Sequence, residues 1–137
     1  MEAFYLINWL ALAICFAFSR VLGVIWYNPQ VFGGMWANAI GLQDGDFDIR
    51  NRRRSLISSL IYNLLAVYGL AVLLKILGVT APYMGLAIGV FVAFFFTIAP
   101  MGNTAALEQW RAARIVIHGA YRLVQFGASG ALLAWWI

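Results

Sequence analysis

Two arginines and a histidine repeat at four-residue steps near the end of the chain. Arg114, His118 and Arg122 fall on one helical face of the otherwise apolar stretch RIVIHGAYRLVQFG, residues 114–127. At the rise of an α-helix, Arg122 lies about 12 Å along the axis from Arg114. An arginine at the centre of a membrane costs about 2.5–3.5 kcal/mol, so a guanidinium at that depth must meet water or a polar group.

A second arginine is expected at a similar depth. Arg20 lies in the first apolar stretch, about 10 Å along a helix from Tyr27. The acidic residue Glu108 is about 21 Å from Arg122 on an unbroken helix and cannot neutralise it there. We therefore expect the two arginines to face an interior cleft, wet or filled by an anion. The side chains expected to share this ligand-binding cleft are Asn63, Tyr62, His118 and Tyr121.

Two interpretations of these arginines are open. Guanidinium groups bind a lipid phosphate, a carboxylate or a small inorganic anion through paired hydrogen bonds, which favours a ligand site. Alternatively, Arg20 and Arg122 reach backbone carbonyls or Glu108 of another segment, and merely hold the helices together. Replacing Arg122 by glutamine separates the two, because only the first interpretation makes anion binding depend on this residue.

No catalytic, metal or cofactor site is expected. His118 is the only histidine and Cys15 the only cysteine, whereas a zinc ion normally takes three or four protein ligands. A proton relay through His118 would need acidic partners that the apolar stretches lack. Ser58, Ser59 and Ser129 are not accompanied by a base-and-carboxylate pattern. Binding is therefore expected rather than chemistry.

The composition indicates an all-α integral membrane protein. Of the 137 residues, 64% are hydrophobic and 10% charged, and the mean hydropathy is +0.86. A membrane-spanning helix takes about 20 residues, and four apolar stretches have that order of length. The net charge of +4 does not suggest nucleic-acid binding, because no soluble domain is left to carry a recognition surface. The four predicted spans are residues 3–27, 56–78, 83–99 and 114–136.

Two connecting segments differ from the spans. Residues 29–42 are too short to cross a membrane, and their apolar residues recur at three- and four-residue steps, which predicts a short interfacial helix. Residues 43–54 form a polar, basic loop. Asp44, Asp46 and Asp48 have the spacing of a calcium loop, but neither the required glycine nor the closing glutamate follows. These aspartates are instead expected to cap the next helix and to pair with neighbouring arginines.

Small residues form a stripe on the third span. Gly85, Gly89 and Ala93 are four residues apart, and this spacing lets another helix approach closely. Gly127 on the last span is assigned to helix packing as well. The spacing leaves open whether the partner is another span of this chain or a second subunit.

The basic residues predict the orientation. Arginines concentrate in the first and third connections, whereas Lys75 is the only cation near the opposite face. Because positive loops remain cytoplasmic, both termini are expected outside the cytoplasm. The arginines of these connections are Arg50, Arg52, Arg53, Arg54, Arg111 and Arg114.

The stretch VLGVIWYNPQVFGGMWANAIGL, residues 21–42, resembles domain-of-unknown-function family 1761, in which a G-x-x-W-Y-x-P-x-x-F-G-x-x-W run follows the first span. The final stretch, from residue 117, is similar to that family's closing pattern. The likeness covers almost the whole chain. The matching residues are Gly23, Trp26, Tyr27, Pro29, Phe32, Gly33 and Trp36, then Gly119, Tyr121, Gly130 and Trp135.

The resemblance implies a small four-span bacterial inner-membrane protein without an assigned activity. It also implies that the motif after the first span is a folded element near the membrane interface. Together with the arginines, this favours a protein that binds or transports a small anionic or amphipathic ligand or a lipid, as a homo-oligomer. The alternative is a non-catalytic accessory subunit of a larger membrane complex, with its partners docked on Gly85 and Gly89.

Overall fold

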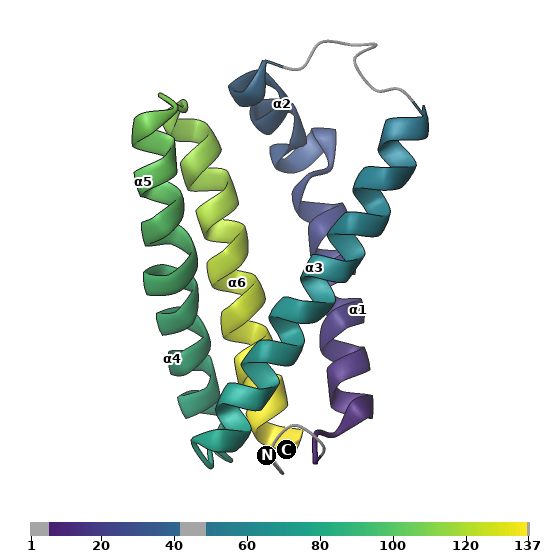
Figure 1. Ribbon diagram of the computed structural model, residues 1–137, viewed down its shortest axis with the longest axis vertical. Helices are drawn as coiled ribbons and strands as arrows, with labels where there is room; N and C mark the ends of the chain where they lie inside the picture. The colour runs from purple at the N-terminus through teal and green to yellow at the C-terminus, as the bar shows by residue number, and fades with distance from the viewer. Residues whose placement is uncertain (1–5, 42–48, 137) are drawn as a thin grey trace.

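The computed structural model describes residues 6–41 and 49–136, and every regular element in this part of the chain is a helix (Figure 1). Asp44, Asp46 and Asp48, and with them the predicted caps and ion pairs of the polar loop, lie outside the described residues. The elements in chain order are α1 (Trp9–Trp26), η2 (Pro29–Gly33), α2 (Gly34–Ile40), α3 (Ile49–Ile76), α4 (Pro82–Val92), η3 (Ala93–Ile98), α5 (Ala99–Leu107) and α6 (Ala112–Trp136).

Three helical segments are long and apolar enough to cross a membrane. They are Trp9–Trp26, Arg53–Ile76 and Pro82–Leu107. By the same measure of the described residues, α6 is not among them although it has 25 residues. Its sequence includes Arg122 and Gln125, which lower the hydropathy of a helix that is long enough to span.

Asparagine side chains set the ends of the first helix and of the motif that follows it. Asn8 Oδ1 accepts hydrogen bonds from the backbone N–H groups of Leu10 and Ala11, which caps the start of α1. Asn28 precedes Pro29 and caps the π-helical turn η2 through the N–H of Gln30. At Gly33, an added Cβ would collide with the backbone carbonyl of Tyr27, so the turn requires glycine at this position.

The third membrane-length segment continues through a proline. We expected it to end at residue 99, but α4, η3 and α5 follow one another without a break to Leu107. Proline within a helix removes one N–H donor and crowds the carbonyl four residues earlier. The turn just before Pro100 is π-helical, and this wider turn relieves that crowding. The chain then reverses at residues 108–111 and enters α6.

The stripe of small residues on α4 packs against α6 of the same chain. A Cβ added at Gly85 would collide with the carbonyl oxygen of Gly130, and one at Gly89 with that of Phe126. Ala93 is fully buried, and Gly127 faces Val90. The two backbones are therefore in direct contact, and the face with the two α4 glycines is covered within the chain rather than open to a partner.

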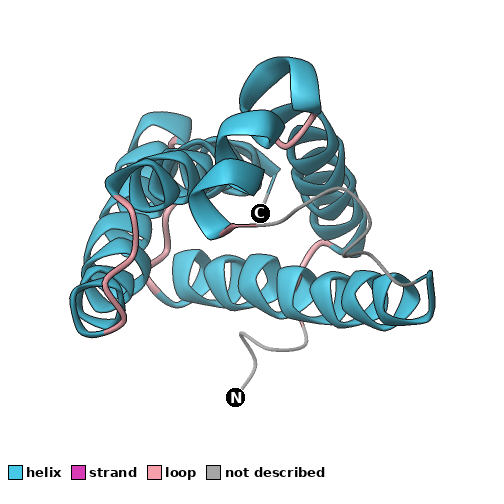
Figure 2. Ribbon diagram, turned by 90° about the horizontal axis from the view of Figure 1, so that it is seen from above, coloured by secondary structure: helices cyan, strands magenta, loops and turns pink. Residues whose placement is uncertain are grey.

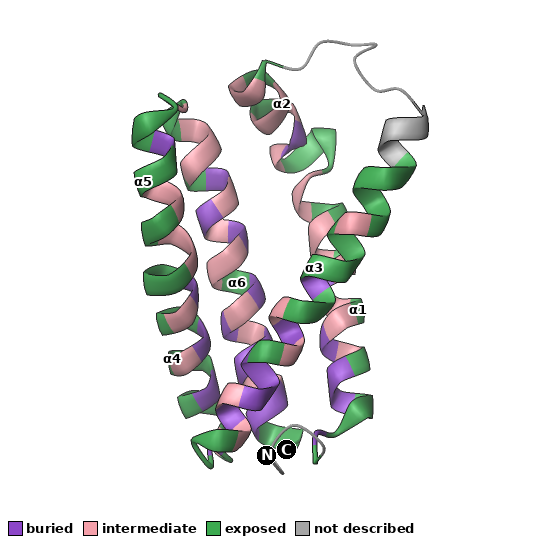
Figure 3. Cartoon of the chain, in the orientation of Figure 1, coloured by how far each residue is buried: buried purple, intermediate pink, exposed green. Residues whose placement is uncertain are grey.

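The helices form a fork that is closed at the end where α1 begins and α6 ends. At this end Asn8 Nδ2 donates to the Trp136 carbonyl at 3.1 Å, and Leu12, Leu74 and Leu133 lie in the hydrophobic core. Figure 3 shows buried residues gathered in this half. Toward the other end, α3 diverges from α6, and α2 lies between them (Figures 1 and 2).

Candidate functional site

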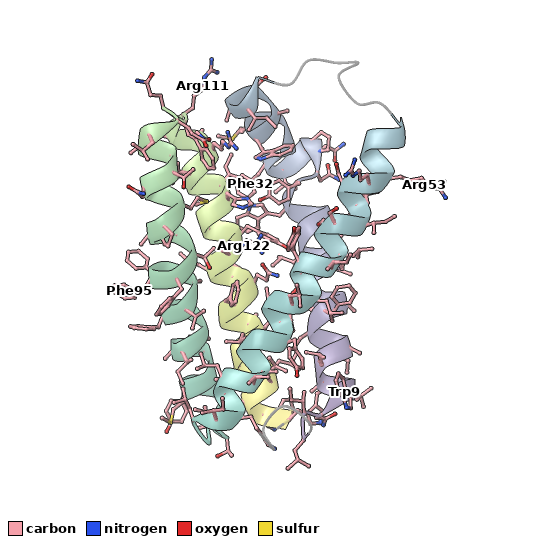
Figure 4. All side chains as sticks on the ribbon, viewed as in Figure 1. Trp9, Phe32, Arg53, Phe95, Arg111 and Arg122 are labelled. Carbon is pink, nitrogen blue, oxygen red and sulfur yellow. The ribbon has the colours of Figure 1, made fainter. Side chains whose placement is uncertain are left out.

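A layer of polar side chains lies where α1, α3 and α6 begin to diverge, above the apolar core. In Figure 4, Arg122 extends from α6 into the space between α6 and α3. Such side chains in the middle of apolar helices are costly unless they are bonded to one another. The layer consists of Ser19 and Arg20 on α1, Ser59 and Asn63 on α3, and Tyr121, Arg122 and Gln125 on α6.

Gln125 links Arg122 to α3. Arg122 Nη1 donates to Gln125 Oε1 at 2.8 Å, and Gln125 Nε2 donates to Asn63 Oδ1 at 2.5 Å. Gln125 is 1% exposed and Asn63 7% exposed, so this chain of bonds is inaccessible to bulk water. The arginine is thereby held in one orientation by a side chain one helical turn away.

Arg20 lies at the same level on the opposite side. Its Nη1 donates to Ser59 Oγ at 2.9 Å, which joins α1 to α3. Tyr121 Oη donates to the Ser19 carbonyl at 3.1 Å, which joins α6 to α1. Arg122 Cζ lies 5.5 Å from the centroid of the Tyr121 ring, and Tyr121 Oη is bonded to the residue before Arg20, so this ring is near both arginines. The equal depth that helix geometry predicts for the two arginines agrees with these bonds.

The positive charge of this layer is not balanced by the described side chains. No ion pair joins residues within 6–41 or 53–136. Glu108 accepts a hydrogen bond from Trp110 Nε1 at 2.6 Å, at the turn between α5 and α6. The alternative in which Arg20 or Arg122 reaches Glu108 is therefore not what the geometry gives. Both guanidinium groups keep donors for another acceptor.

Several buried polar atoms of the layer lack hydrogen-bond partners among the residues that the structure describes. They include Arg122 Nε and Asn63 Nδ2, which belong to the two side chains joined through Gln125. Ser19 Oγ and Ser129 Oγ are the others. A buried donor without a partner costs about 1–3 kcal/mol, so such groups in a folded protein call for a specific acceptor. Two of these unpaired donors thus belong to side chains on two different helices, α6 and α3.

An aromatic layer covers the polar one on the side of α2. Tyr27 Oη and His118 Nδ1 are hydrogen-bonded at 2.7 Å, and Trp26 Nε1 donates to the Ile117 carbonyl at 3.1 Å. The rings of Trp26 and Phe32 are 4.8 Å apart between centroids. The motif after the first helix therefore folds back onto α6. The site therefore has the two arginines on one side and the aromatic rings of this motif on the other.

The hydrogen bond between Tyr27 and His118 gives a first prediction. Tyr27→Phe removes this bond and keeps the ring, which packs against Trp36 at a centroid distance of 5.4 Å. We expect the free energy of unfolding to fall by about 1 kcal/mol. Titration with a denaturing detergent measures it. Tyr83→Phe is the control, because Tyr83 is 75% exposed, and an equal effect of both substitutions would contradict the role given to the bond.

The structure brings together Arg20, Asn63, Tyr121 and Arg122, four of the six side chains expected to share the cleft. The fifth, His118, lies one turn away, in the aromatic layer. Tyr62 is 71% exposed and is not part of the site. Gln125, Ser19 and Ser59 were missed. Helical spacing could have indicated two of them. Gln125 follows Arg122 by one helical turn and Ser59 precedes Asn63 by one turn, so each shares a helix face with a predicted residue.

The arrangement is suited to holding an anion. Arg122 and Asn63 present N–H donors, and a carboxylate or phosphate oxygen accepts such bonds from guanidinium groups in pairs. In the described part of the chain, no three histidine, cysteine, aspartate or glutamate side chains lie close enough to share a metal ion. His118 is bonded to Tyr27 rather than to a serine hydroxyl.

The model of a family described as "Protein of unknown function (DUF1761)" matches residues 10–134. No curated protein and no solved structure matches the chain.

Proposed function

The chain belongs to the DUF1761 family of proteins of unknown function, and we propose that it is a multi-pass integral membrane protein that binds an anionic group between α1, α3 and α6. The anionic group is that of a lipid, an amphipathic molecule or a small ion. The bacterial inner membrane is the proposed location, with both termini outside the cytoplasm. The arginines near the α2 end, such as Arg111 and Arg114, support this orientation.

In this proposal α6 is the fourth span. Its low hydropathy does not oppose insertion, because Gln125, Ser129 and Tyr121 are buried against the other helices rather than turned toward lipid. The segment formed by η2 and α2 is proposed to lie in the interface. The Arg111 Nη1 donor, 3.1 Å from the Asn38 carbonyl, ties its end to the turn before α6.

The observation that carries the ligand proposal is the unbalanced charge of Arg20 and Arg122. Both side chains are half-buried within apolar helices, and neither is paired with a carboxylate of the described residues. Arg122 Nε in addition is buried without an acceptor there. A desolvated positive charge is costly, and an anion bound through two hydrogen bonds would offset this cost.

Binding is supported better than passage across the membrane. Beyond the polar layer, toward the end where α1 begins, the bundle is filled by side chains such as Cys15, Leu70 and Leu133. A partner docked on Gly85 and Gly89, as an accessory subunit would require, has no access because α6 covers these residues. The proposal therefore takes the arginine site as the functional one.

Two substitutions test this proposal by opposite means. Arg122→Gln removes the cation, whereas Gln125→Glu keeps it and supplies an internal carboxylate one turn away. Each is expected to lower the affinity of the delipidated protein for dioleoylphosphatidylglycerol at least about tenfold, the loss of one charge-assisted hydrogen bond. Native mass spectrometry with added lipid measures the affinity and also reports the number of subunits.

The control is Lys75→Gln, which changes the net charge by the same amount near the other end of the bundle. Its affinity for the lipid should stay at the wild-type value. Equal affinities of the wild type, Arg122→Gln and Lys75→Gln would overturn the proposed site. A fall in stability without a fall in affinity would leave Arg122 with a packing role only.

A further inference from the structure

The first half of α3 leaves the bundle. None of residues 53–62, all of them described, is buried, and only Ser58 is half-buried. In the second half of the helix, Val67, Leu70 and Leu74 are between 0% and 3% exposed. Figure 3 shows α3 mostly exposed in the half that diverges from α6 and buried in the other half, and Asn63 is the first buried residue after residues 53–62.

The face of α3 that turns toward the arginines is polar along this exposed half. Ser55, Ser59 and Asn63 follow one another at four-residue steps, and the next step is the buried Val67. Ser59 Oγ contacts Arg20, and Asn63 Oδ1 contacts Gln125, which fixes the direction of this face. A membrane-length helix thus carries a polar track from its first turns down to the arginine layer.

The site is closed in two other directions. Below it, the space between Leu70, Gln125 and Ser129 is too small for a water molecule. Toward α2, the bond between Tyr27 and His118 and the ring of Phe32 cover the site. The remaining side is lateral. None of residues 53–62 of α3 is buried, so this half of the helix is not covered by the other helices and would face the bilayer.

From this geometry we propose that the anionic ligand is a membrane lipid, whose phosphate reaches Arg122 and Arg20 sideways between α3 and α6. The inference rests on the proposed function and names the class of its ligand. The phosphate accepts bonds from Arg122 Nε and Asn63 Nδ2, two of the buried donors that have no partner among the described residues. The acyl chains lie in the bilayer beside exposed side chains of α3 that follow Asn63, such as Leu64 and Leu65.

Charge and shape both favour a lipid over a free ion. Two guanidinium groups without a carboxylate match a phosphate headgroup. A free ion would have to pass the aromatic cover or cross lipid. A lipid in the same leaflet starts with its headgroup at the level of the first turns of α3, and its phosphate can follow the polar track to the arginine layer. The polar track can contact the headgroup of a lipid, while the neighbouring apolar surface of α3 can contact its acyl chains.

The experiment compares two phenylalanine substitutions of unchanged charge on opposite faces of α3. Ser55→Phe fills the polar track, while Ile57→Phe lies about 200° around the helix on the side that is exposed to lipid. We expect Ser55→Phe to lower the affinity for dioleoylphosphatidylglycerol about tenfold, and Ile57→Phe to leave it within about twofold of wild type. Circular dichroism and gel filtration verify that both variants are folded.

A second measurement uses the unchanged protein. Dioleoylphosphatidylglycerol should bind at least about tenfold more tightly than inorganic phosphate, and zwitterionic dioleoylphosphatidylcholine should bind at least about tenfold more weakly than dioleoylphosphatidylglycerol. Equal affinity for inorganic phosphate would overturn the lipid assignment. An unchanged affinity of Ser55→Phe would overturn the lateral route.

Either failure is distinguishable from failure of the proposed function itself. If Arg122→Gln loses lipid and Ser55→Phe does not, the anion site stands and the lateral lipid route falls. If Arg122→Gln binds the lipid as the wild type does, the arginine site and the lipid assignment fall together.

Discussion

Gly89→Ala should lower the free energy of unfolding by about 3 kcal/mol, at the upper end of the cost of overpacking a tight contact. The added methyl group would collide with the carbonyl oxygen of Phe126 and crowd the backbone nitrogen of Gly127. These are backbone atoms of α6, so no side chain can turn aside to make space. To accept the methyl group, α4 and α6 must separate along their whole contact.

Two other glycines provide the control. An added Cβ at Gly69 on α3 or at Gly102 on α5 meets no described atom within 4 Å. In a helix, alanine is favoured over glycine by up to about 1 kcal/mol, so these substitutions should be neutral or slightly stabilising. Titration with a denaturing detergent, followed by circular dichroism, compares the three variants. If Gly89→Ala were as stable as Gly102→Ala, the close contact between α4 and α6 would be wrong.

The close contact itself was predictable from the sequence, but its partner was not. Four-residue spacing from Gly85 to Ala93 indicates a face that another helix can approach. The same spacing serves a contact within a chain or between subunits. On the partner face of α6, Gly127 and Gly130 are three residues apart rather than four. This spacing does not mark the face as the one that packs against the small residues of α4.

The end of the third membrane-length segment shows where a local rule fails. Proline usually ends a helix at the preceding residue, which predicted an end at residue 99. The chain instead forms the π-helical turn Ala93–Ile98 and keeps the helix intact to Leu107. The contact of η3 with α6, seen for example between Ile98 and Gly119, favours continuation over a break. Such tertiary packing is not encoded in the neighbourhood of Pro100.

The depth of the two arginines could be predicted from the sequence, because the rise per residue of a helix places Arg20 and Arg122 at a similar level. Their hydrogen-bond partners were not. Asn63 and Tyr62 are adjacent in sequence, and only the direction in which α3 packs decides that the first is buried and the second exposed. Gln125 was not predicted because a glutamine within an apolar stretch does not by itself indicate which helix it faces.

Gln125→Leu should lower the free energy of unfolding by about 3 kcal/mol, although leucine has a similar volume and suits an apolar interior. The substitution removes the acceptor of Arg122 Nη1 and the donor to Asn63 Oδ1 at once. Each buried group left unpaired costs about 1–3 kcal/mol. Water is a poor replacement on the α3 side, because Asn63 is 7% exposed and its side-chain oxygen loses its donor in a buried position.

Two companion variants identify the cause of this loss. Gln125→Glu retains an acceptor for Arg122, and the Asn63 amide can turn to donate to the new carboxylate, so its stability should stay within about 1 kcal/mol of wild type. Asn63→Leu combined with Gln125→Leu removes both ends of their bond, and the double variant should be less destabilised than the sum of the two single changes. Strictly additive losses would mean that Asn63 and Gln125 do not depend on each other, and the polar layer would then not act as a connected network.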